Sequence, residues 1–317
     1  MFIKIILNKF YFFLFKLKEK IIFNNGISMS KQFDSYLKIN DFSEVEFSSF
    51  SQNGEDGIID WLVTTLGIKE RMNCIEIGCG NYLESNTRFL VKKRNWPALL
   101  IDSDKNNIDL IKSDSIYWRN TIVAVNDYVQ MDNVNEIIKS NNFINNVGLL
   151  SIDIDSIDYW VLSKIEFKPI IIICEYNAIF GDKLKLTVPY DQKFNRNKKH
   201  YSNLYFGASI NAFIDLLKQK NYSFLGTDSR GINAFFVLKD YSLQIEEKIK
   251  YKRVFKSTHR EALNQEGKLS YINFNEQLSL IHNLDLLDLQ NNQTIEIQMI
   301  QNNVYSENYI RNSYNDF

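Results

Sequence analysis

The segment NCIEIGCGNYLESNTRFL, residues 73–90, decides the fold of this chain. It opens with an apolar run that carries one acidic residue, Glu76, and it continues through two glycines, Gly78 and Gly80. After the glycines the pattern becomes amphipathic, which is typical of a helix. A strand, a glycine turn and a helix in this order bring backbone N–H groups close to a bound ligand in α/β proteins. The segment therefore predicts an α/β fold with a ligand-binding loop at residues 76–80.

The same alternation of apolar runs and amphipathic segments continues from about residue 49 to residue 240. Near-continuous Ile, Leu and Val strands indicate a sheet that is covered on both faces, and strand–helix alternation indicates parallel crossovers. The seven predicted strands lie at residues 73–78, 97–102, 120–125, 147–154, 169–176, 222–227 and 233–238. Helices are expected at residues 84–94, 105–112, 133–139, 159–165 and 207–220. Because the turn TDSRGI joins the last two strands, we predict a Rossmann-like, doubly wound sheet of seven mostly parallel strands with a terminal antiparallel hairpin.

Length and composition limit the class of protein. A chain of 317 residues has room for about two domains, and a hydrophobic share of 45% excludes global disorder. We divide it into an N-terminal extension (1–48), a central α/β domain (49–240) and a C-terminal extension (241–317). The net charge of −1 excludes the overall basic field of a nucleic-acid-binding protein. The three cysteines lack metal-ligand spacing and predict a reduced, cytoplasmic protein.

The first twenty residues, MFIKIILNKFYFFLFKLKEK, mix bulky apolar side chains with five lysines. Their longest uninterrupted apolar run, residues 10–15, is too short to span a bilayer as a helix. A basic amphipathic helix that lies on an anionic lipid surface is one interpretation, with peripheral membrane contact through residues 1–20. Two others stay open: the segment packs on the domain, or translation begins at Met29.

The two glycines match only part of the pattern that binds dinucleotides. A G-x-G-x-x-G motif counted from Gly78 would place its third glycine at Leu83, so a pyrophosphate loses support. The pattern suits a ligand that carries an amino acid and a nucleoside but no phosphate, with Glu76 holding the ammonium group directly or through water. Asp102 closes the next predicted strand, where a carboxylate accepts hydrogen bonds from ribose hydroxyls. The alternative for Asp102 is a helix cap, a role that Asp104 fits better.

On these residues the chain resembles the class I S-adenosylmethionine-dependent methyltransferases. The motifs that carry the resemblance are IEIGCG (75–80) as the cofactor loop and LLIDSD (99–104) as the ribose-binding strand end. The chain also resembles a narrower bacterial group that is tied to O-methylation of surface or capsular polysaccharides and natural products. That likeness extends over about residues 49–240 through SQNGEDGII, ESNTRFL, SIDIDSIDYW, EYNAIFG, TVPYD and GINAFFV.

The resemblance implies further residues around the cofactor, which would be S-adenosylmethionine. In this fold the segment before the first strand touches the cofactor, so candidates there are Gln52, Asn53 and Glu55. Asp127, after the third strand, is implied to lie near the adenine. The chain departs from the group at Ile157, where a smaller or polar residue is expected.

Acidic residues close the fourth and fifth predicted strands. Asp153 and Asp155 are two residues apart, so their side chains point the same way, and Glu175 and Asn177 are related in the same manner. Both pairs emerge at the carboxyl edge of the sheet, where α/β folds bind substrates. Asp153, Glu175 and Asn177 are the candidate ligands of Mg²⁺ or another divalent cation, which would orient and acidify a hydroxyl acceptor. This arrangement resembles the metal site of catechol-type O-methyltransferases.

Other interpretations of these acids stay open. A carboxylate of Asp153, Asp155 or Glu175 could take the acceptor's proton without a metal. Asp155 could instead cap the following helix, with Asp158 in its first turn. An unpaired carboxylate in an apolar run is costly, so Asp153 and Glu175 are the strongest functional candidates.

A long polar segment, residues 180–207, follows the fifth strand and is expected on the acceptor side. Its cations Arg196, Lys198 and Lys199 could meet an anionic acceptor, such as a phosphorylated or nucleotide-linked sugar, or they could form a solvated charge run. His200 is either a general base or an ordinary surface histidine.

The sequence thus predicts an S-adenosylmethionine-dependent O-methyltransferase that acts on a small molecule or sugar. Two alternatives are a non-catalytic scaffold that keeps the fold and an NAD-dependent sugar oxidoreductase, which Leu83 disfavours. The acceptor and the oligomeric state are not predicted.

Overall fold

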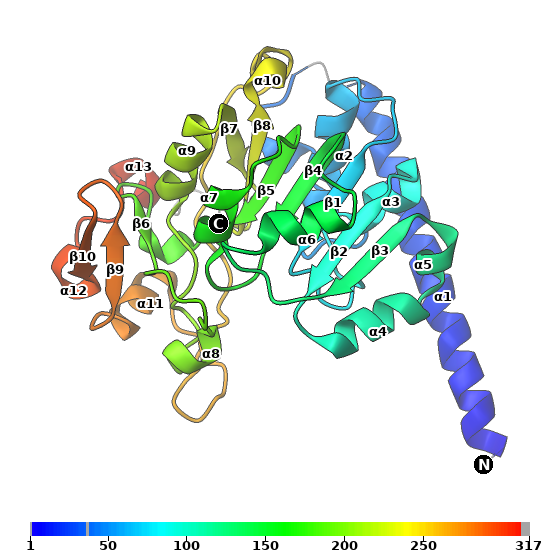
Figure 1. Cartoon of the computed structure of the whole chain (residues 1–317), viewed down its shortest axis with the longest axis horizontal. Coiled ribbons are helices and arrows are strands. Elements are labelled where there is room, and N and C mark those ends of the chain that lie inside the picture. The colour runs from blue at the N-terminus through cyan, green and yellow to red at the C-terminus, as the bar shows by residue number, and fades with distance from the viewer. Residues whose placement is uncertain (1, 36–37, 312–317) are drawn as a thin grey trace.

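The computed structural model describes residues 2–35 and 38–311 and confirms the predicted sheet. Its strands are β1 (Asn73–Ile77), β2 (Ala98–Asp102), β3 (Ile122–Asn126), β4 (Val147–Ile152), β5 (Ile171–Glu175), β7 (Tyr222–Thr227) and β8 (Asn233–Leu238). They run in the order β3-β2-β1-β4-β5-β8-β7, and β1 to β5 are parallel. β8 lies antiparallel between β5 and β7, so the predicted hairpin closes one edge of the sheet (Figure 1).

Helices cover both faces of this sheet, as its apolar strands predict. Successive residues of β1, Cys74 and Ile75, belong to two separate cores because side chains alternate along a strand. The core that contains Ile75 includes residues of α6 (Val134–Ser140), α7 (Asp158–Lys164) and α9 (Ile210–Gln219). The core that contains Cys74 includes residues of α2 (Glu55–Thr65), α3 (Arg88–Arg94), α4 (Lys105–Ser113), α5 (Ser115–Arg119) and α10 (Lys239–Glu246).

Two helices begin later than the sequence predicts. α3 starts at Arg88 instead of residue 84, because residues 85–87 wrap around the carboxylate of Glu76. α9 starts at Ile210 instead of residue 207, because Ser209 is its N-cap. In both places the amphipathic pattern begins several residues before the backbone becomes helical.

The C-terminal extension contributes to a second sheet together with the segment after β5. Its strands are β6 (Leu186–Thr187), β9 (Asp285–Asp288) and β10 (Gln293–Glu296), which are antiparallel in the order β10-β9-β6. The other helices are α8 (Arg196–Lys199), α11 (Phe274–Leu280), α12 (Ile297–Ile300) and α13 (Glu307–Arg311), with short 3-10 turns at η1 (Lys31–Ser35), η2 (Phe42–Glu44) and η3 (Ala178–Phe180). Leu286 and Ile297 belong to the core that also holds α9, so this sheet is an extension of the same body.

The chain begins with one long helix, α1 (Phe2–Ser30). Its second half packs on the domain: the ring of Phe23 lies 5.8 Å from that of Phe89, and Glu19 accepts hydrogen bonds from Arg88 and Lys92 at 2.8 Å each. Its first half extends beyond the domain, past α4 (Figure 1). Within the described part of the chain, no helix has the length and apolar character needed to cross a membrane.

A buried carboxylate at the start of α2 organises the backbone that precedes it. Oδ2 of Asp56 accepts hydrogen bonds from the N–H groups of Ser49, Phe50 and Ser51 at 2.6–2.9 Å. Burial nevertheless raises the pKa of Asp56 to about 7, from an ordinary value of 3.8. The carbonyl of Phe50 in turn accepts from the N–H of Ser85, so this turn also supports the segment before α3.

We expect Asp56 to make the stability of the protein depend on pH. Its pKa is higher in the folded chain than in the unfolded chain, so folding retains a proton that the unfolded state releases. The free energy of unfolding should therefore fall as the pH rises from about 4 to about 7. Asp56→Asn keeps an acceptor oxygen and should flatten this slope in urea unfolding curves. A slope identical to that of the wild type would contradict the assignment.

Candidate functional site

At the end of β1 the backbone of Gly78 lies against the carbonyl group of Asp153, which leaves no room for a side chain at position 78. Gly78 has φ +85°, and a Cβ atom built on it would lie 1.5 Å from the carbonyl oxygen of Asp153. The N–H of Asp153 donates to the carbonyl of Ile77 at 3.0 Å. Glycine is therefore required here, both for the left-handed backbone and for the approach of the chain after β4. Gly80 differs, because a Cβ atom there would meet nothing within 4 Å.

Asp102 lies at the end of β2, and its carboxylate holds the turn that contains Gly78 and Gly80, which we call the glycine loop. Its Oδ2 accepts from the N–H of Gly80 at 2.8 Å, and its Oδ1 accepts from the N–H of Asp104 and the amide of Asn107 at 2.8 and 3.1 Å. Because an ionised carboxylate has about four acceptor positions, Asp102 keeps capacity for a ligand hydroxyl. As predicted, it is Asp104 that caps α4, accepting from the N–H of Asn106 at 2.8 Å.

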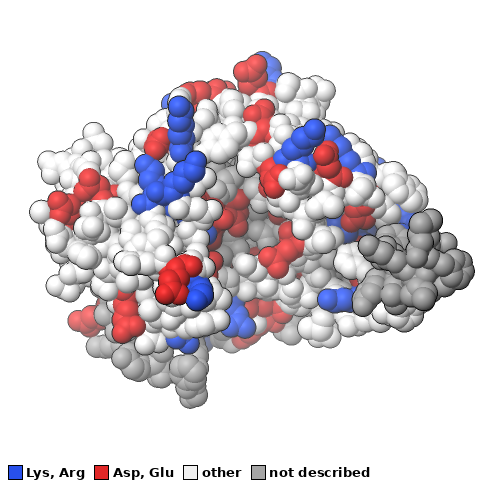
Figure 2. Space-filling model, turned by 90° about the horizontal axis from the view of Figure 1, so that it is seen from below, with Lys and Arg blue, Asp and Glu red and all other residues white. Residues whose placement is uncertain are grey.

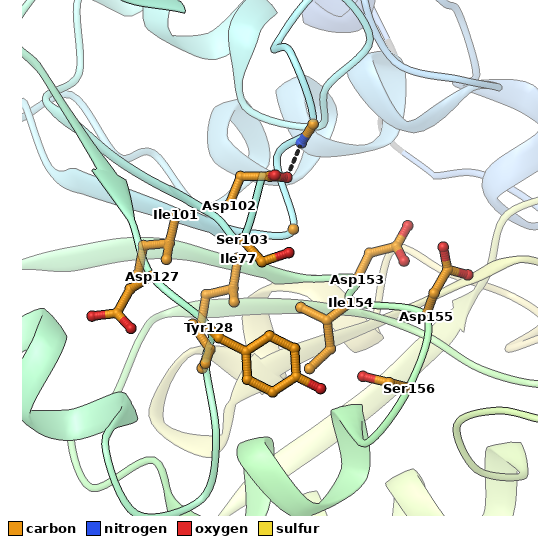
Figure 3. Close-up of a pocket in the computed structure, with 13 residues that line it drawn as sticks. Ile77, Ile101, Asp102, Ser103, Asp127, Tyr128, Asp153, Ile154, Asp155 and Ser156 are labelled. Atoms are coloured by element: carbon orange, nitrogen blue, oxygen red, sulfur yellow. Dashed lines mark hydrogen bonds between the residues drawn. The ribbon is translucent and has the colours of Figure 1, made fainter. Parts of the chain in front are cut away.

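Two cavities adjoin this loop and share Gly78, Gly80 and Asp153 among their lining residues. The first cavity, of about 260 Å³, lies between the ends of β1, β2 and β4 and is drawn in Figure 3. Its lining includes Asp102 and Tyr128. The second cavity, of about 500 Å³, has a lining that includes Gln52, Glu76, Asn81, Glu84, Asn86 and Asn233. An elongated ligand in contact with the glycine loop can therefore reach both cavities.

Figure 3 shows how the residues of the first cavity are arranged. Asp102 lies near the glycine loop, whereas Asp127 lies at the opposite end from Asp153 and Asp155. The ring of Tyr128 extends between these ends, and its hydroxyl donates to the carbonyl of Phe194 at 2.8 Å. Asp127 lines the cavity, and its place near an adenine stays a prediction, whereas Tyr128 offers a flat apolar face there.

Glu76 is buried and already has four donors around it. Its carboxylate accepts from the hydroxyl of Ser85 at 2.6 Å, from the N–H groups of Asn86 and Thr87 at 2.9 and 3.2 Å, and from the hydroxyl of Thr87 at 2.5 Å. Burial raises the pKa of Glu76 in spite of these bonds. In this structure Glu76 fixes the entry into α3, and its predicted contact with a ligand ammonium group stays a prediction.

The segment before α2 supplies one cavity residue and two supporting residues. Gln52 lines the second cavity. Asn53 donates its backbone N–H to Glu55 at 2.8 Å, and the buried carboxylate of Glu55 accepts from the amide of Asn233 at 2.9 Å. The roles of all three residues toward a cofactor stay predictions; Asn53 and Glu55 line neither of the two cavities, and Glu55 holds the amide of Asn233.

The carboxylates of Asp153, Asp155 and Glu175 converge at the carboxyl ends of β4 and β5. One oxygen from each lies within 4.8 Å of the others. Burial, and then the charges of neighbouring acids, raise the pKa of Asp153 and of Glu175 well above the usual range. Oε2 of Glu175 is buried and has no hydrogen-bond partner. We refer to these three residues as the carboxylate cluster.

Asp155 does not cap α7, in contrast to one interpretation of the sequence. The N-cap residue is Ile157, which makes no side-chain cap, and Asp158 in the first turn accepts from the N–H groups of Ile154 and Ser156 at 2.8 and 3.0 Å. The carboxylate of Asp155 instead forms an ion pair with Arg196, and its backbone has φ +54°. The neighbouring Ile157 is buried in the core, which explains why an apolar residue fits there.

The cations on the acceptor side are largely paired. Arg196 binds Asp155 and, at 2.6 Å, Glu261, and its guanidinium lies 4.0 Å from the centre of the Phe206 ring. Lys199 pairs with Asp191 at 2.8 Å. Only Arg196 is largely enclosed, with a side chain that is 13% exposed, whereas Lys198 and Lys199 are exposed, in agreement with a solvated charge run.

Two other predicted residues lie outside the carboxylate cluster. The amide of Asn177 donates to the carbonyls of Leu204 and Phe206 at 2.9 and 3.0 Å, and its oxygen caps η3. Nδ1 of His200 lies 2.8 Å from the hydroxyl of Ser202. The metal-binding role of Asn177 and the catalytic role of His200 stay predictions without support from their surroundings.

Sequence reasoning did not single out Asn233 or Tyr128. Asn233 begins β8 opposite Glu175 in the sheet register, and its Oδ1 is buried without a partner. Its position at the start of an apolar strand, in GINAFFV, was the available signal. No sequence pattern placed Tyr128 at the cavity, because its position depends on where the chain turns after β3.

Comparisons with known proteins add similarity of fold only. No protein-family model matches the chain, and neither does any curated protein sequence. Among solved structures, an S-adenosylmethionine-dependent methyltransferase from Clostridium acetobutylicum is 12% identical with a TM-score of 0.37, over 58% of this chain and 90% of that one. A TDP-rhamnose 3′-O-methyltransferase of calicheamicin biosynthesis is 11% identical with a TM-score of 0.34, over 57% and 77%.

A third structure, geranyl diphosphate C-methyltransferase from Streptomyces coelicolor with Mg²⁺ and S-adenosyl-L-homocysteine, is 10% identical with a TM-score of 0.34, over 54% of this chain and 62% of that one. Similarity at this level carries no argument about activity.

The two glycines of the loop should respond differently to the same substitution. Gly78→Ala places a methyl group against the backbone of Asp153, so we expect a large loss of stability, of several kcal/mol. Gly80→Ala meets open space and should cost only about 1 kcal/mol for its positive φ, while its methyl group enters the space beside the cavities. Thermal unfolding of both variants measures this difference. Equal losses of stability would contradict the described close approach.

Proposed function

We propose that this chain is an S-adenosylmethionine-dependent methyltransferase that modifies a hydroxyl group of a small molecule or sugar. The observation that carries the proposal is the position of Glu76 at the start of α3. A dinucleotide site presents the N–H groups of a helix N-terminus to a pyrophosphate. Here the N–H groups of Asn86 and Thr87 donate to Glu76, and that of Arg88 donates to Ser85. An internal anion therefore takes the place where a phosphate would bind.

The rest of the loop suits the nucleoside of S-adenosylmethionine. Asp102 would accept hydrogen bonds from the ribose hydroxyls, and the open side of Gly80 would let the ligand approach the backbone. Tyr128 would lie against the adenine in the first cavity. The second cavity, with Gln52 and Asn233, would take the amino-acid end. These residues bind and orient a donor that, when bound, supplies an activated methyl group.

The carboxylate cluster fits a role on the acceptor hydroxyl. Asp153 lines both cavities, so it lies where a ligand passes from the first cavity to the second. Oε2 of Glu175 has no partner, and the pKa values of Glu175 and Asp153 stay raised, so Arg196 alone does not compensate the charge of these buried acids. Asp153 and Glu175, with Asp155, would hold a divalent cation such as Mg²⁺, which supplies Lewis acidity toward an oxygen ligand. The cluster would orient the hydroxyl and favour the loss of its proton.

Binding of the donor should depend on Asp102 but not on Asp104. Asp102→Ala removes the ribose acceptor and the support of Gly80, so we expect the dissociation constant of S-adenosylhomocysteine to rise by about tenfold or more, measured by calorimetry. Asp104→Ala is the matched control, because it removes only a helix cap. Unchanged affinity in Asp102→Ala, or tighter binding of NADH than of S-adenosylhomocysteine, would contradict the proposal.

Cation binding should depend on Glu175. We expect wild-type protein to bind Mg²⁺ or Mn²⁺ in calorimetric titrations, and Glu175→Gln to lose this binding while it still binds S-adenosylhomocysteine. Glu261→Gln is the control, because Glu261 contacts Arg196 but is not part of the cluster. Methyl transfer to a hydroxyl acceptor should fall on addition of EDTA. Transfer that resists EDTA but is lost in Asp153→Asn would show that the acids act without a metal.

A further inference from the structure

The half of α1 that extends beyond the domain exposes large apolar side chains. Between residues 10 and 21, six of them are 42–60% exposed: Phe10, Phe13, Leu14, Phe15, Leu17 and Ile21. Scattered single apolar residues are normal on a protein surface, but a continuous group of this kind indicates an interaction site. The proposed methyl transfer makes no use of it.

The exposed charges on the same stretch are positive. Lys18 and Lys20 lie on the surface of the helix among the apolar residues. Glu19, the only acid between residues 10 and 21, is turned toward the domain, where it pairs with Arg88 and Lys92 at 2.8 Å. A second copy of this helix would bring like charges together, whereas an anionic surface would complement them.

We infer that α1 docks the protein on an anionic lipid surface. Bulky apolar side chains interleaved with lysines are typical of helices that lie in the interface, with lysine stems reaching to the headgroups. Lysine is attracted to anionic headgroups, and this attraction falls with ionic strength.

The helix is fixed to the methyltransferase-like body through buried contacts. Arg88, whose side chain is 1% exposed, pairs with both Glu19 and Asp114, at 2.8 and 2.7 Å. Gly26 of α1 is buried, and a Cβ atom there would lie 2.7 Å from the ring of Phe89. Docking of α1 therefore sets the orientation of the whole domain.

The site lies on the side of the molecule toward which α1 extends. The free half of α1 extends on the same side of the molecule as α8 and the carboxyl ends of the parallel strands (Figure 1). Seen from that side, the surface is hollowed and acidic side chains lie within the hollow (Figure 2). The consequence, which rests on the proposed function, is an acceptor carried at a membrane surface, such as a sugar linked to a lipid. Lipid binding itself does not depend on that function.

Flotation of the full chain with vesicles tests the inference. We expect binding to vesicles that contain phosphatidylglycerol, weaker binding as salt is added, and little binding to phosphatidylcholine alone. Phe10→Asp with Phe13→Asp should weaken binding by about tenfold or more, and Lys18→Glu with Lys20→Glu should remove its salt dependence. Leu243→Asp is the matched control, because Leu243 is 73% exposed on α10 and should not matter.

The outcomes separate the alternatives. All variants should keep the wild-type far-ultraviolet circular dichroism and S-adenosylhomocysteine affinity, because the substituted residues are exposed. Absence of vesicle binding by the wild type at low salt would overturn the inference. So would a dimer in sedimentation velocity that Phe10→Asp with Phe13→Asp abolishes while the vesicles stay unbound. If the protein binds vesicles but not S-adenosylhomocysteine, docking of α1 on lipid is supported and the proposed function is wrong.

Discussion

The close approach of two backbone segments, Gly78 and Asp153, is the constraint on which the site depends. The carbonyl of Asp153 occupies the space that any side chain at position 78 would need, and its N–H bonds the last carbonyl of β1. These contacts fix the ends of β1 and β4 against each other. The same contact therefore keeps the glycine loop next to Asp153, the first acid of the carboxylate cluster. Both cavities include the same pair in their lining, so a ligand that contacts the loop also passes the cluster.

A second feature distinguishes this loop from a phosphate-binding turn. Glu76 points from β1 toward residues 85–87 and accepts from their N–H and hydroxyl groups. The carboxylate supplies the negative charge that a helix N-terminus favours, and it also delays the start of α3 to Arg88. A ligand next to this loop meets a glycine backbone and the carboxylate of Asp102. Hydroxyl groups suit that environment and an added phosphate does not.

The strands were predictable because their burial on both faces leaves runs of Ile, Leu and Val with clear boundaries. The positions of the glycine loop and of Asp102 could also be predicted, because each lies directly after a predicted strand. The partners of the acids could not be predicted in this way. Arg196 reaches Asp155 from a segment that is remote in sequence, and β6 pairs with β9 from the C-terminal extension. The late start of α3 was also hidden, because it depends on a side chain from β1 and not on the pattern of the helix itself.

The central claim is that the loop holds the nucleoside of S-adenosylmethionine. A crystal structure of the chain with S-adenosylhomocysteine tests it most directly. We predict that the ribose hydroxyls contact Asp102, that the adenine lies beside Tyr128, and that the amino-acid end reaches the cavity that Asn233 lines. A ligand bound away from the glycine loop would contradict the account. So would a complex with a dinucleotide whose pyrophosphate displaces Glu76 from the start of α3.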